Sequence, residues 1–95
     1  MAGKNLHPNT AKIDLDFPIT VSGVEVSHLI MRRVKVRDDL AASKSGGSDE
    51  DKAVFLIANL CEVAPEDLMD VDAADWSKLE RQIQTFRQAR SQKTG

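Results

Sequence analysis

The sequence predicts an α+β domain in which an N-terminal β-hairpin packs on three to four α-helices. Apolar and polar residues alternate from Lys12 to Val21, which is the period of a half-buried strand. A Ser-Gly pair at 22–23 separates this stretch from a second apolar run, as in a tight hairpin. Closer to the C-terminus, apolar residues recur at helical spacing. Because a lone hairpin is only marginally stable, we expect it to pack on the helices.

The first strand carries its apolar side chains on odd-numbered positions. These are Ile13, Leu15, Phe17, Ile19 and Val21. Pro18 cannot donate to a ladder, so we expect this strand to lie at an edge or to be locally interrupted. The second strand begins at Val24 and ends near Arg32, and its apolar parity changes from even to odd numbers. A bulge near Ser27 and His28 would accommodate that change.

Two helical patterns follow the hairpin. Val36 and Leu40 have helical spacing, and the Ser- and Gly-rich stretch 43–47 ends their segment. Ser48 is a suitable N-cap for the next helix, whose first turn is acidic. Between residues 53 and 61 that helix has a single polar residue, so it is expected to be buried on several sides or to meet another chain.

The C-terminal part predicts a short helix and a longer one. Pro65 fits the first position of a short helix that extends to about Met69. Asp72 can cap the last helix, and Asp75 stands in its first turn. This last helix, which we expect to fray after about Arg87, has the clearest amphipathic pattern in the chain. Its apolar face, suited to the core or to a seam within an oligomer, comprises Trp76, Leu79, Ile83 and Phe86.

Length and composition are typical of one small domain. The chain has 95 residues, is 41% hydrophobic and contains one cysteine, which excludes a disulfide framework. We expect residues 12–88 to form a single domain between flexible tails at 1–11 and 89–95. Neither a membrane span nor a secretory signal is visible, so we expect a cytoplasmic protein without membrane contact. A core this small is marginal alone, which makes self-association reasonable.

The net charge of −2 conceals an uneven distribution. Residues 49–75 hold nine acidic side chains and one basic one, whereas residues 76–95 hold five basic and one acidic. Helix dipoles and a solvated surface account for this pattern, and a polarised surface that steers a partner is the alternative. A basic cluster, interpreted as a solvated edge, is formed by Arg32, Arg33, Lys35 and Arg37.

No catalytic pair, cofactor motif or metal site stands out in the sequence. His7, His28 and Cys61 are the soft metal-ligand candidates, and their spacing brings no two of them onto one face. The aspartates within 70–75 lack the glycine and the further oxygen ligand of a calcium loop. We therefore expect neither an enzyme nor a bound cofactor.

Residues 57–68 have the look of a helix-turn-helix unit, which binds DNA through its second helix. That helix would present Glu66, Asp67 and Asp70 to phosphate, and no Lys or Arg lies between residues 53 and 78 to offset the repulsion. Nucleic-acid binding is disfavoured for this reason. A DNA-binding regulator of the helix-turn-helix type remains the alternative function.

Two stretches occur in an order and spacing that match a known family. The first comprises Asp16-Phe17-Pro18-Ile19-Thr20-Val21-Ser22-Gly23-Val24-Glu25-Val26, Leu29-Ile30-Met31-Arg32-Arg33 and Val36-Arg37-Asp38. The second comprises Ile57-Ala58-Asn59-Leu60-Cys61-Glu62-Val63-Ala64-Pro65-Glu66-Asp67-Leu68 and Asp75-Trp76-Ser77-Lys78-Leu79. Over residues 12–86 the chain resembles the small tail assembly chaperones of contractile-tailed phages and Mu-like prophages. Family members often have Pro where Val34 stands here.

The resemblance implies a non-enzymatic role in the cytoplasm of the bacterial host. Such chaperones bind the tape-measure protein, a long helical chain, and keep it soluble until the tail tube polymerises around it. A frameshifted longer form would recruit the tail tube protein. Since a chaperone needs accessible apolar surface, the candidate partner-binding residues are Val54, Phe55 and Leu56 in the apolar helix. Burial in the core is the competing expectation for each of them.

Overall fold

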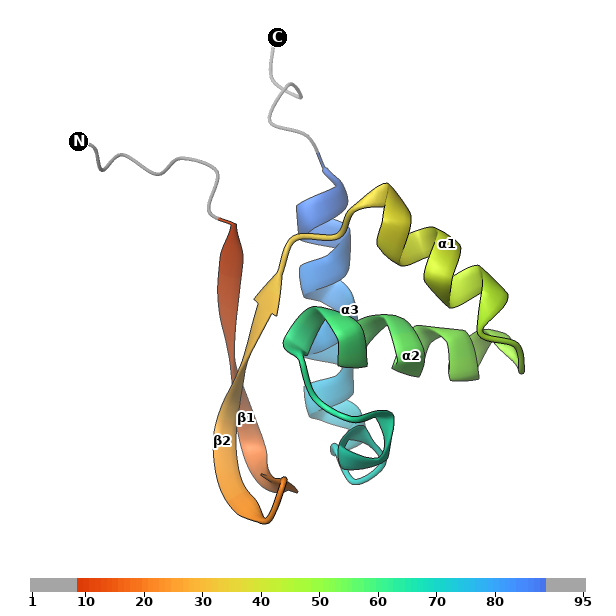
Figure 1. The fold of residues 1–95 in the computed structure, drawn as a ribbon. Coiled ribbons are helices and arrows are strands. Elements are labelled where there is room, and N and C mark those ends of the chain that lie inside the picture. Colours follow the sequence, from red (N-terminus) through yellow and green to blue (C-terminus); the bar gives the residue numbers. More distant parts are fainter. Residues whose placement is uncertain (1–8, 89–95) are drawn as a thin grey trace, which may run out of the picture.

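The computed structural model describes residues 9–88, which form two strands, three α-helices and one 3-10 turn (Figure 1). The elements are β1 (Thr10–Val21), β2 (Val24–Arg32), α1 (Val36–Lys44), α2 (Asp49–Cys61), η1 (Pro65–Leu68) and α3 (Ala73–Arg87). The predicted α+β class is therefore confirmed. β1 begins two residues before its expected start. Of the expected tails, residues 1–8 and 89–95 lie outside the described part of the chain.

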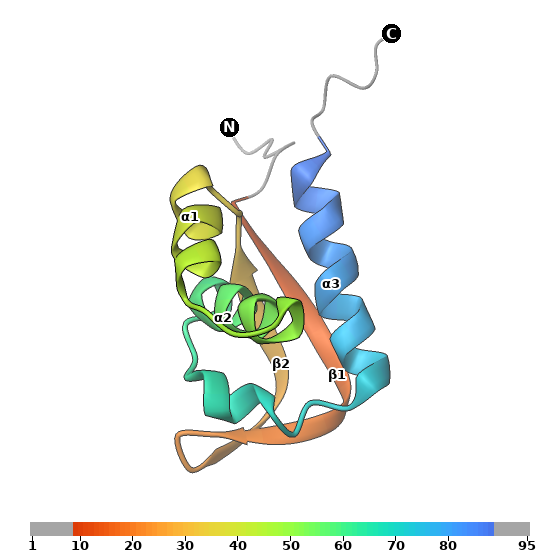
Figure 2. The same ribbon diagram turned by 90° about the vertical axis from the view of Figure 1, so that its right-hand side faces the viewer.

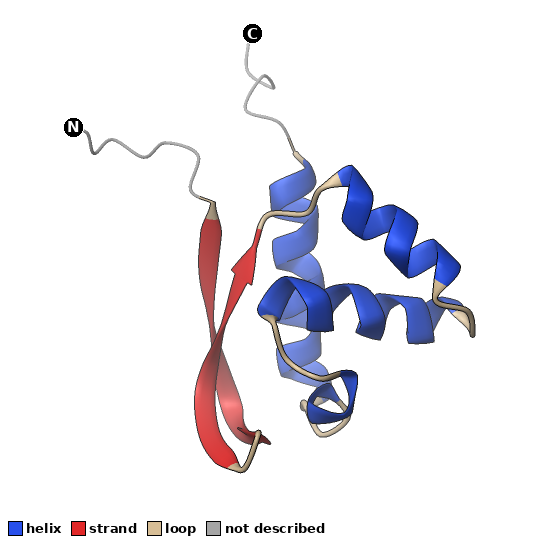
Figure 3. Cartoon of the chain, viewed as in Figure 1, coloured by secondary structure: helices blue, strands red, loops and turns tan. Residues whose placement is uncertain are grey.

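The hairpin forms one layer, and the helices form a second layer on one of its faces (Figure 3). α3 packs along β1, while α2 lies against β2 and also contacts α1 and η1 (Figure 2). The expectation that α2 is buried on several sides is thus confirmed. No helix among residues 9–88 combines the length and the apolar character that crossing a bilayer requires.

The core lies between the hairpin and the helices. Its buried apolar residues are Ile13, Leu15, Ile19, Leu29, Met31, Ala42, Leu56, Ile57, Ala58, Leu60, Cys61, Leu68, Leu79, Ile83 and Phe86. The predicted apolar face of α3 is in this core, except that Trp76 is half-buried at its margin. Burial of these side chains is the main force that holds the hairpin on the helices.

The two strands are joined by a two-residue turn in which both residues are left-handed. Ser22 has φ 51° and Gly23 has φ 81°. Two consecutive positive φ values define the type I′ turn, whose twist matches that of the flanking strands. The predicted hairpin turn and the positive φ of Gly23 are confirmed.

The ladder of the hairpin is interrupted once. Asp14 faces His28 and Ile19 faces Val26, so the four residues of β1 from 15 to 18 stand opposite Ser27 alone. The predicted change of register near Ser27 is confirmed, but the extra residues belong to β1 and not to β2. These residues include Pro18, which has no N–H to donate to the ladder. Of the two expectations for this strand, an edge position or a local interruption, the interruption is therefore observed at the proline.

The predicted helix ends are largely confirmed. Ser48 caps α2 by accepting a hydrogen bond from the Asp51 N–H at 3.1 Å, and Asp72 caps α3 by accepting one from the Ala74 N–H at 2.9 Å. The short helix that begins at Pro65 is a single 3-10 turn rather than an α-helix.

Candidate partner-binding surface

The three candidate residues on α2 differ in accessibility. Leu56 is only 8% exposed and belongs to the core. Val54 and Phe55 are half-buried and pack against that core from its margin. Successive helix residues point about 100° apart, so three consecutive side chains cannot share one face. The structure therefore leaves two of the three candidates partly accessible on the surface of α2.

Other large apolar side chains are more exposed than these candidates. They are Phe17, Val24, Ile30, Val36, Leu40 and Met69. None of these side chains was predicted as a contact residue. Two of them, Val36 and Leu40, have the helical spacing that predicted this helix, and apolar residues at such spacing ordinarily pack inward.

α1 is turned so that its apolar face points to solvent. Val36 is 75% exposed and Leu40 is 54% exposed, whereas Asp38 is only 4% exposed. The reason is an ion pair: Arg32 Nη1 and Nη2 donate to Asp38 Oδ2 and Oδ1, both at 2.9 Å. The same carboxylate accepts a hydrogen bond from the Lys35 N–H at 2.8 Å and so caps the helix. The hydrogen bonds from Arg32 lower the pKa of the Asp38 carboxyl.

A second ion pair ties α1 to the end of α3. Arg87 Nη1 and Nη2 donate to Asp39 Oδ2 and Oδ1 at 3.1 and 2.9 Å. These hydrogen bonds lower the pKa of Asp39. Both acidic side chains of α1 are thus bound within the molecule. The remaining charged side chains of α1, Arg37 and Lys44, are basic and exposed.

The interpretation of the basic cluster as a solvated edge is wrong for its first two members. Arg32 is half-buried in the ion pair with Asp38. Arg33 donates from Nη2 to the Phe86 carbonyl oxygen at 2.8 Å and stacks over the Phe86 ring, 5.0 Å from its centre. These two arginines fasten the end of β2 to α1 and α3. Lys35 and Arg37 remain exposed, as expected.

The interruption of β1 is held by Asp75, whose place in the first turn of α3 predicts only a favourable interaction with the helix dipole. Its Oδ1 and Oδ2 accept hydrogen bonds from the Asp16 and Phe17 N–H groups at 2.9 and 3.0 Å. Asp75 is fully buried, and Lys78 Nζ lies 3.3 Å from its Oδ1. Burial alone would raise the pKa of Asp75, but the two N–H donors and Lys78 outweigh it and lower the pKa.

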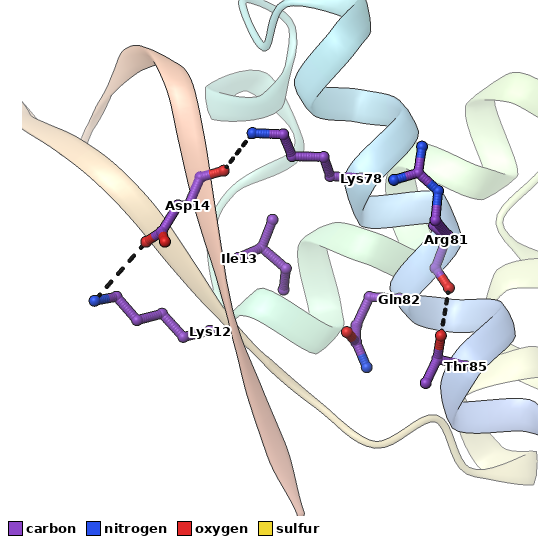
Figure 4. A pocket seen from close by; sticks show the side chains of 7 residues that line it. All are labelled: Lys12, Ile13, Asp14, Lys78, Arg81, Gln82 and Thr85. Carbon is purple, nitrogen blue, oxygen red and sulfur yellow. Dashed lines mark hydrogen bonds and ion pairs between the residues drawn. The ribbon is translucent and has the colours of Figure 1, made fainter.

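An open groove of about 300 Å³ runs between β1 and α3 (Figure 4). It is lined by Lys12, Ile13, Asp14, Lys78, Arg81, Gln82 and Thr85. Lys78 crosses one end of it and donates from Nζ to the Asp14 carbonyl oxygen at 3.0 Å. The groove holds cations and one exposed carboxylate but no pairing of a nucleophile with a base, so its side chains offer no catalytic arrangement.

The soft metal-ligand candidates are not brought together. Cys61 is buried in the core, and burial raises the pKa of its thiol to about 12. His28 is exposed on the hairpin, and His7 lies outside the described residues. Among residues 9–88 no group of three or more His, Cys, Asp or Glu side chains is arranged to hold a metal ion.

The segment that resembles a helix-turn-helix unit lacks a recognition helix. η1 has four residues in a 3-10 turn, and Leu68 of this turn is buried in the core. Glu66 on the same turn is exposed and would repel phosphate. The geometry gives no support to the DNA-binding alternative.

Comparison with known proteins identifies one family. A family model described as "Phage tail assembly chaperone proteins, E, or 41 or 14" matches residues 12–88. No curated protein and no solved structure matches the chain. The matched segment begins at the third residue of β1 and ends one residue after α3, so it includes all but the first two residues of the elements described above.

Proposed function

Because the chain belongs to the phage tail assembly chaperone family, we propose that it binds the tape-measure protein of its tail and keeps that protein soluble until the tube polymerises. Membership in this family confirms the resemblance seen in the sequence. It also makes the protein a non-enzymatic chaperone whose partners are tail proteins and which acts in the host cell.

The observation that supports the client site is the partial exposure of Val54 and Phe55 on α2. Both side chains pack on the core and still reach the surface. An amphipathic helix of a client can bury its apolar stripe against such side chains without unfolding the chaperone. Leu56 lies behind them and supports their position through the core.

The proposal also includes where the chaperone meets its client and how the tail tube protein is recruited. We place the encounter in the bacterial cytoplasm, where tail proteins are made. A frameshifted longer product would carry the tail tube protein to the same complex. The nucleotide sequence tests this second part directly, because it requires a slippery run near the end of the open reading frame and a second frame that continues beyond its stop codon.

The main test is co-expression with the tape-measure protein of the same tail gene cluster. Soluble client is measured with and without the chaperone, and light scattering gives the mass of the purified complex. The proposal predicts that the client precipitates alone and is recovered in a defined complex. A client that is insoluble in both cases, with no complex formed, would contradict the proposal for this form of the chain.

Variants test the site on α2. Val54→Ser and Phe55→Ser should each reduce the recovered client severalfold while the chaperone itself stays folded. Val71→Ser is the matched control, because Val71 is also half-buried against the core but lies outside α2. Leu56→Ala is not diagnostic, since it removes core packing and costs about 2–5 kcal/mol of stability. Equal recovery with all three serine variants would move the client site away from α2.

A further inference from the structure

The outer edge of β1 carries backbone groups that do not bond to β2. The Arg33 N–H donates to the Asn9 carbonyl oxygen at 2.9 Å, and these two residues face each other in the register of the hairpin. They therefore form a hydrogen-bonded pair, and such pairs recur at every second residue of an antiparallel ladder. The alternate residues of β1, which direct their N–H and C=O groups away from β2, are Thr10, Lys12 and Asp14.

α3 satisfies only part of this edge. Lys78 Nζ donates to the Asp14 carbonyl oxygen at 3.0 Å, which agrees with the outward direction of that group. Further along the strand, the interrupted part of β1 is bound by the carboxylate of Asp75. Outside the hairpin ladder, no hydrogen bond to the backbone of Thr10 or Lys12 is found among residues 9–88. The first half of β1 thus has an edge without a partner in the described chain.

This edge forms one wall of the groove between β1 and α3 (Figure 4). β1 and α3 lie close together at the start of α3 and diverge toward its end, as Figure 2 shows. Lys78 crosses the groove near its narrow end. The opposite wall presents the polar side chains of Arg81, Gln82 and Thr85. Free backbone groups that face polar side chains are suited to a further strand and not to an apolar ligand.

The groove also has a surplus of positive charge. Lys12 Nζ lies 3.8 Å from the carboxylate of Asp14, the one acidic side chain of the lining, and Lys78 is paired with two aspartates. Arg81 is exposed, and no ion pair of its guanidinium is found among residues 9–88. A ligand that brings one carboxylate into the groove would therefore meet an arginine that has no competing partner there.

We propose that this groove binds an extended, acidic segment of another protein, which adds to the outer edge of β1 as a third strand. The backbone of that segment pairs with the N–H and C=O groups of Thr10 and Lys12, and one of its Asp or Glu side chains pairs with Arg81. The backbone bonds hold any extended chain, whereas the arginine selects an acidic one. This inference goes beyond the proposed function, because it concerns a surface other than α2 and does not depend on the client.

The length of the free edge sets the expected strength. A third strand of about five residues can run beside Thr10–Asp14 before Lys78 blocks its path. So short a segment covers far less than the roughly 800 Å² per partner of a stable interface, and the dissociation constant should be on the order of 100 μM. Because Arg81 is exposed, binding should weaken as the salt concentration rises.

The test is a titration of the full chain with synthetic peptides of about seven residues, blocked at both ends and followed through the amide chemical shifts in NMR. The first peptide alternates threonine and valine around a central glutamate, and the second has lysine in place of that glutamate. The third is the first peptide with methyl groups on its three central amide nitrogens, which removes the donors on both of its edges. The glutamate peptide should bind, and the lysine and methylated peptides should bind at least tenfold more weakly.

The shifts also give the position of the bound peptide. Changes should centre on residues 10–14 and 81–85. Exchange of the Lys12 amide with solvent should slow severalfold, whereas that of Ala11, which already bonds to β2, should not change. Shifts centred on Val54 and Phe55 would place the peptide on α2 and overturn the proposal. Absence of binding, or equal affinity for the glutamate peptide and either of the other two, would overturn it as well.

Two pairs of variants separate charge from shape. Arg81→Glu should weaken binding of the glutamate peptide at least tenfold and favour the lysine peptide. Arg37→Glu makes the same charge change at an exposed position of α1 and should bind as the parent chain does. Thr85→Trp fills the groove and should abolish binding, whereas Gln84→Trp places the same side chain outside the lining of the groove and should not. All four positions are exposed, so the variants should stay folded. Undiminished binding in either groove variant would overturn the proposal.

Discussion

Arg32 and Asp38 form a two-armed ion pair, with both N–O distances at 2.9 Å, that turns the polar side of α1 toward the protein. The carboxylate is buried and also caps the helix at the Lys35 N–H. With that side fixed inward, Val36 and Leu40 stay 75% and 54% exposed to solvent. A single pair of side chains thus turns a helix with the spacing of a core helix so that its apolar side is exposed.

Loss of this pair should destabilise the domain. We expect Asp38→Ala to lower the free energy of unfolding by about 1–3 kcal/mol, because Arg32 and the Lys35 N–H both lose their acceptor. Urea unfolding measures this change. Asp49→Ala, an exposed acidic residue in the first turn of α2, is the control and should stay within about 0.5 kcal/mol. Equal effects at the two positions would mean that the pair does not anchor α1.

Asp75 should be essential to the interrupted part of β1. In Asp75→Asn only one side-chain oxygen remains for the Asp16 and Phe17 N–H groups, and an amide donor faces the other. We expect a clear loss of stability in urea and faster amide exchange at residues 16 and 17. Asp72→Asn is the matched control on the same helix and should be nearly neutral, because Asn caps helices as well as Asp does.

Acid should destabilise the protein through the same carboxylates. Hydrogen bonds from Arg32 and Arg87 lower the pKa values of Asp38 and Asp39, and those from the β1 backbone outweigh burial at Asp75. Each group has a folded-state pKa below its unfolded value, 3.8 for an ordinary aspartate. Their stabilisation is therefore complete above that value and is lost as the pH falls through the folded-state pKa values.

A series of thermal melts from pH 6 to pH 2 measures this dependence. The melting temperature should stay level down to about pH 4 and then fall. In Asp75→Asn, which starts lower, the fall should be shallower because one of the titrating groups is gone. A melting temperature that rises on acidification would contradict the assignment of these carboxylates.

Most of the fold could be predicted because its signals are local. The hairpin turn needs only Ser22 and Gly23, and the start of α2 needs only Ser48 and Asp51. The face of α3 follows from apolar residues within one helix. In each case the residues that decide the structure lie close together in the sequence, so the sequence pattern alone is enough to predict the element.

What could not be predicted depends on partners far away in the chain. The interruption falls in β1 because Asp75 accepts hydrogen bonds from the Asp16 and Phe17 N–H groups, which the interruption leaves without partners in β2. Asp75 lies 59 and 58 positions after these two residues. The orientation of α1 depends on Arg32 and, through Asp39, on Arg87 at the far end of α3. Spacing alone gives the apolar side of α1 but not the direction in which that side points.

The candidate site on α2 also has one part that local sequence predicts and one part that depends on distant neighbours. A run of apolar residues on α2 indicated that a contact surface was available there, and it could not tell Leu56 in the core from Phe55 at the surface. That distinction requires knowing which neighbours cover the helix. The stronger exposure of Val36, Leu40 and Met69 was likewise hidden, because it results from tertiary contacts and not from composition.

Glu62 offers a test of how α2 ends. It adopts a left-handed conformation with φ 59°, and the Val63 N–H then donates to the Ala58 carbonyl oxygen at 3.0 Å, which closes the helix as a Schellman motif. Glycine reaches this conformation without the clash of a Cβ atom. Glu62→Gly should therefore raise the free energy of unfolding by about 0.5–1 kcal/mol, measured in urea. Ala64→Gly is the control: φ is −73° there, so glycine relieves no strain and should lower stability instead. If both substitutions destabilised the protein equally, the left-handed end of α2 would not be a strained position.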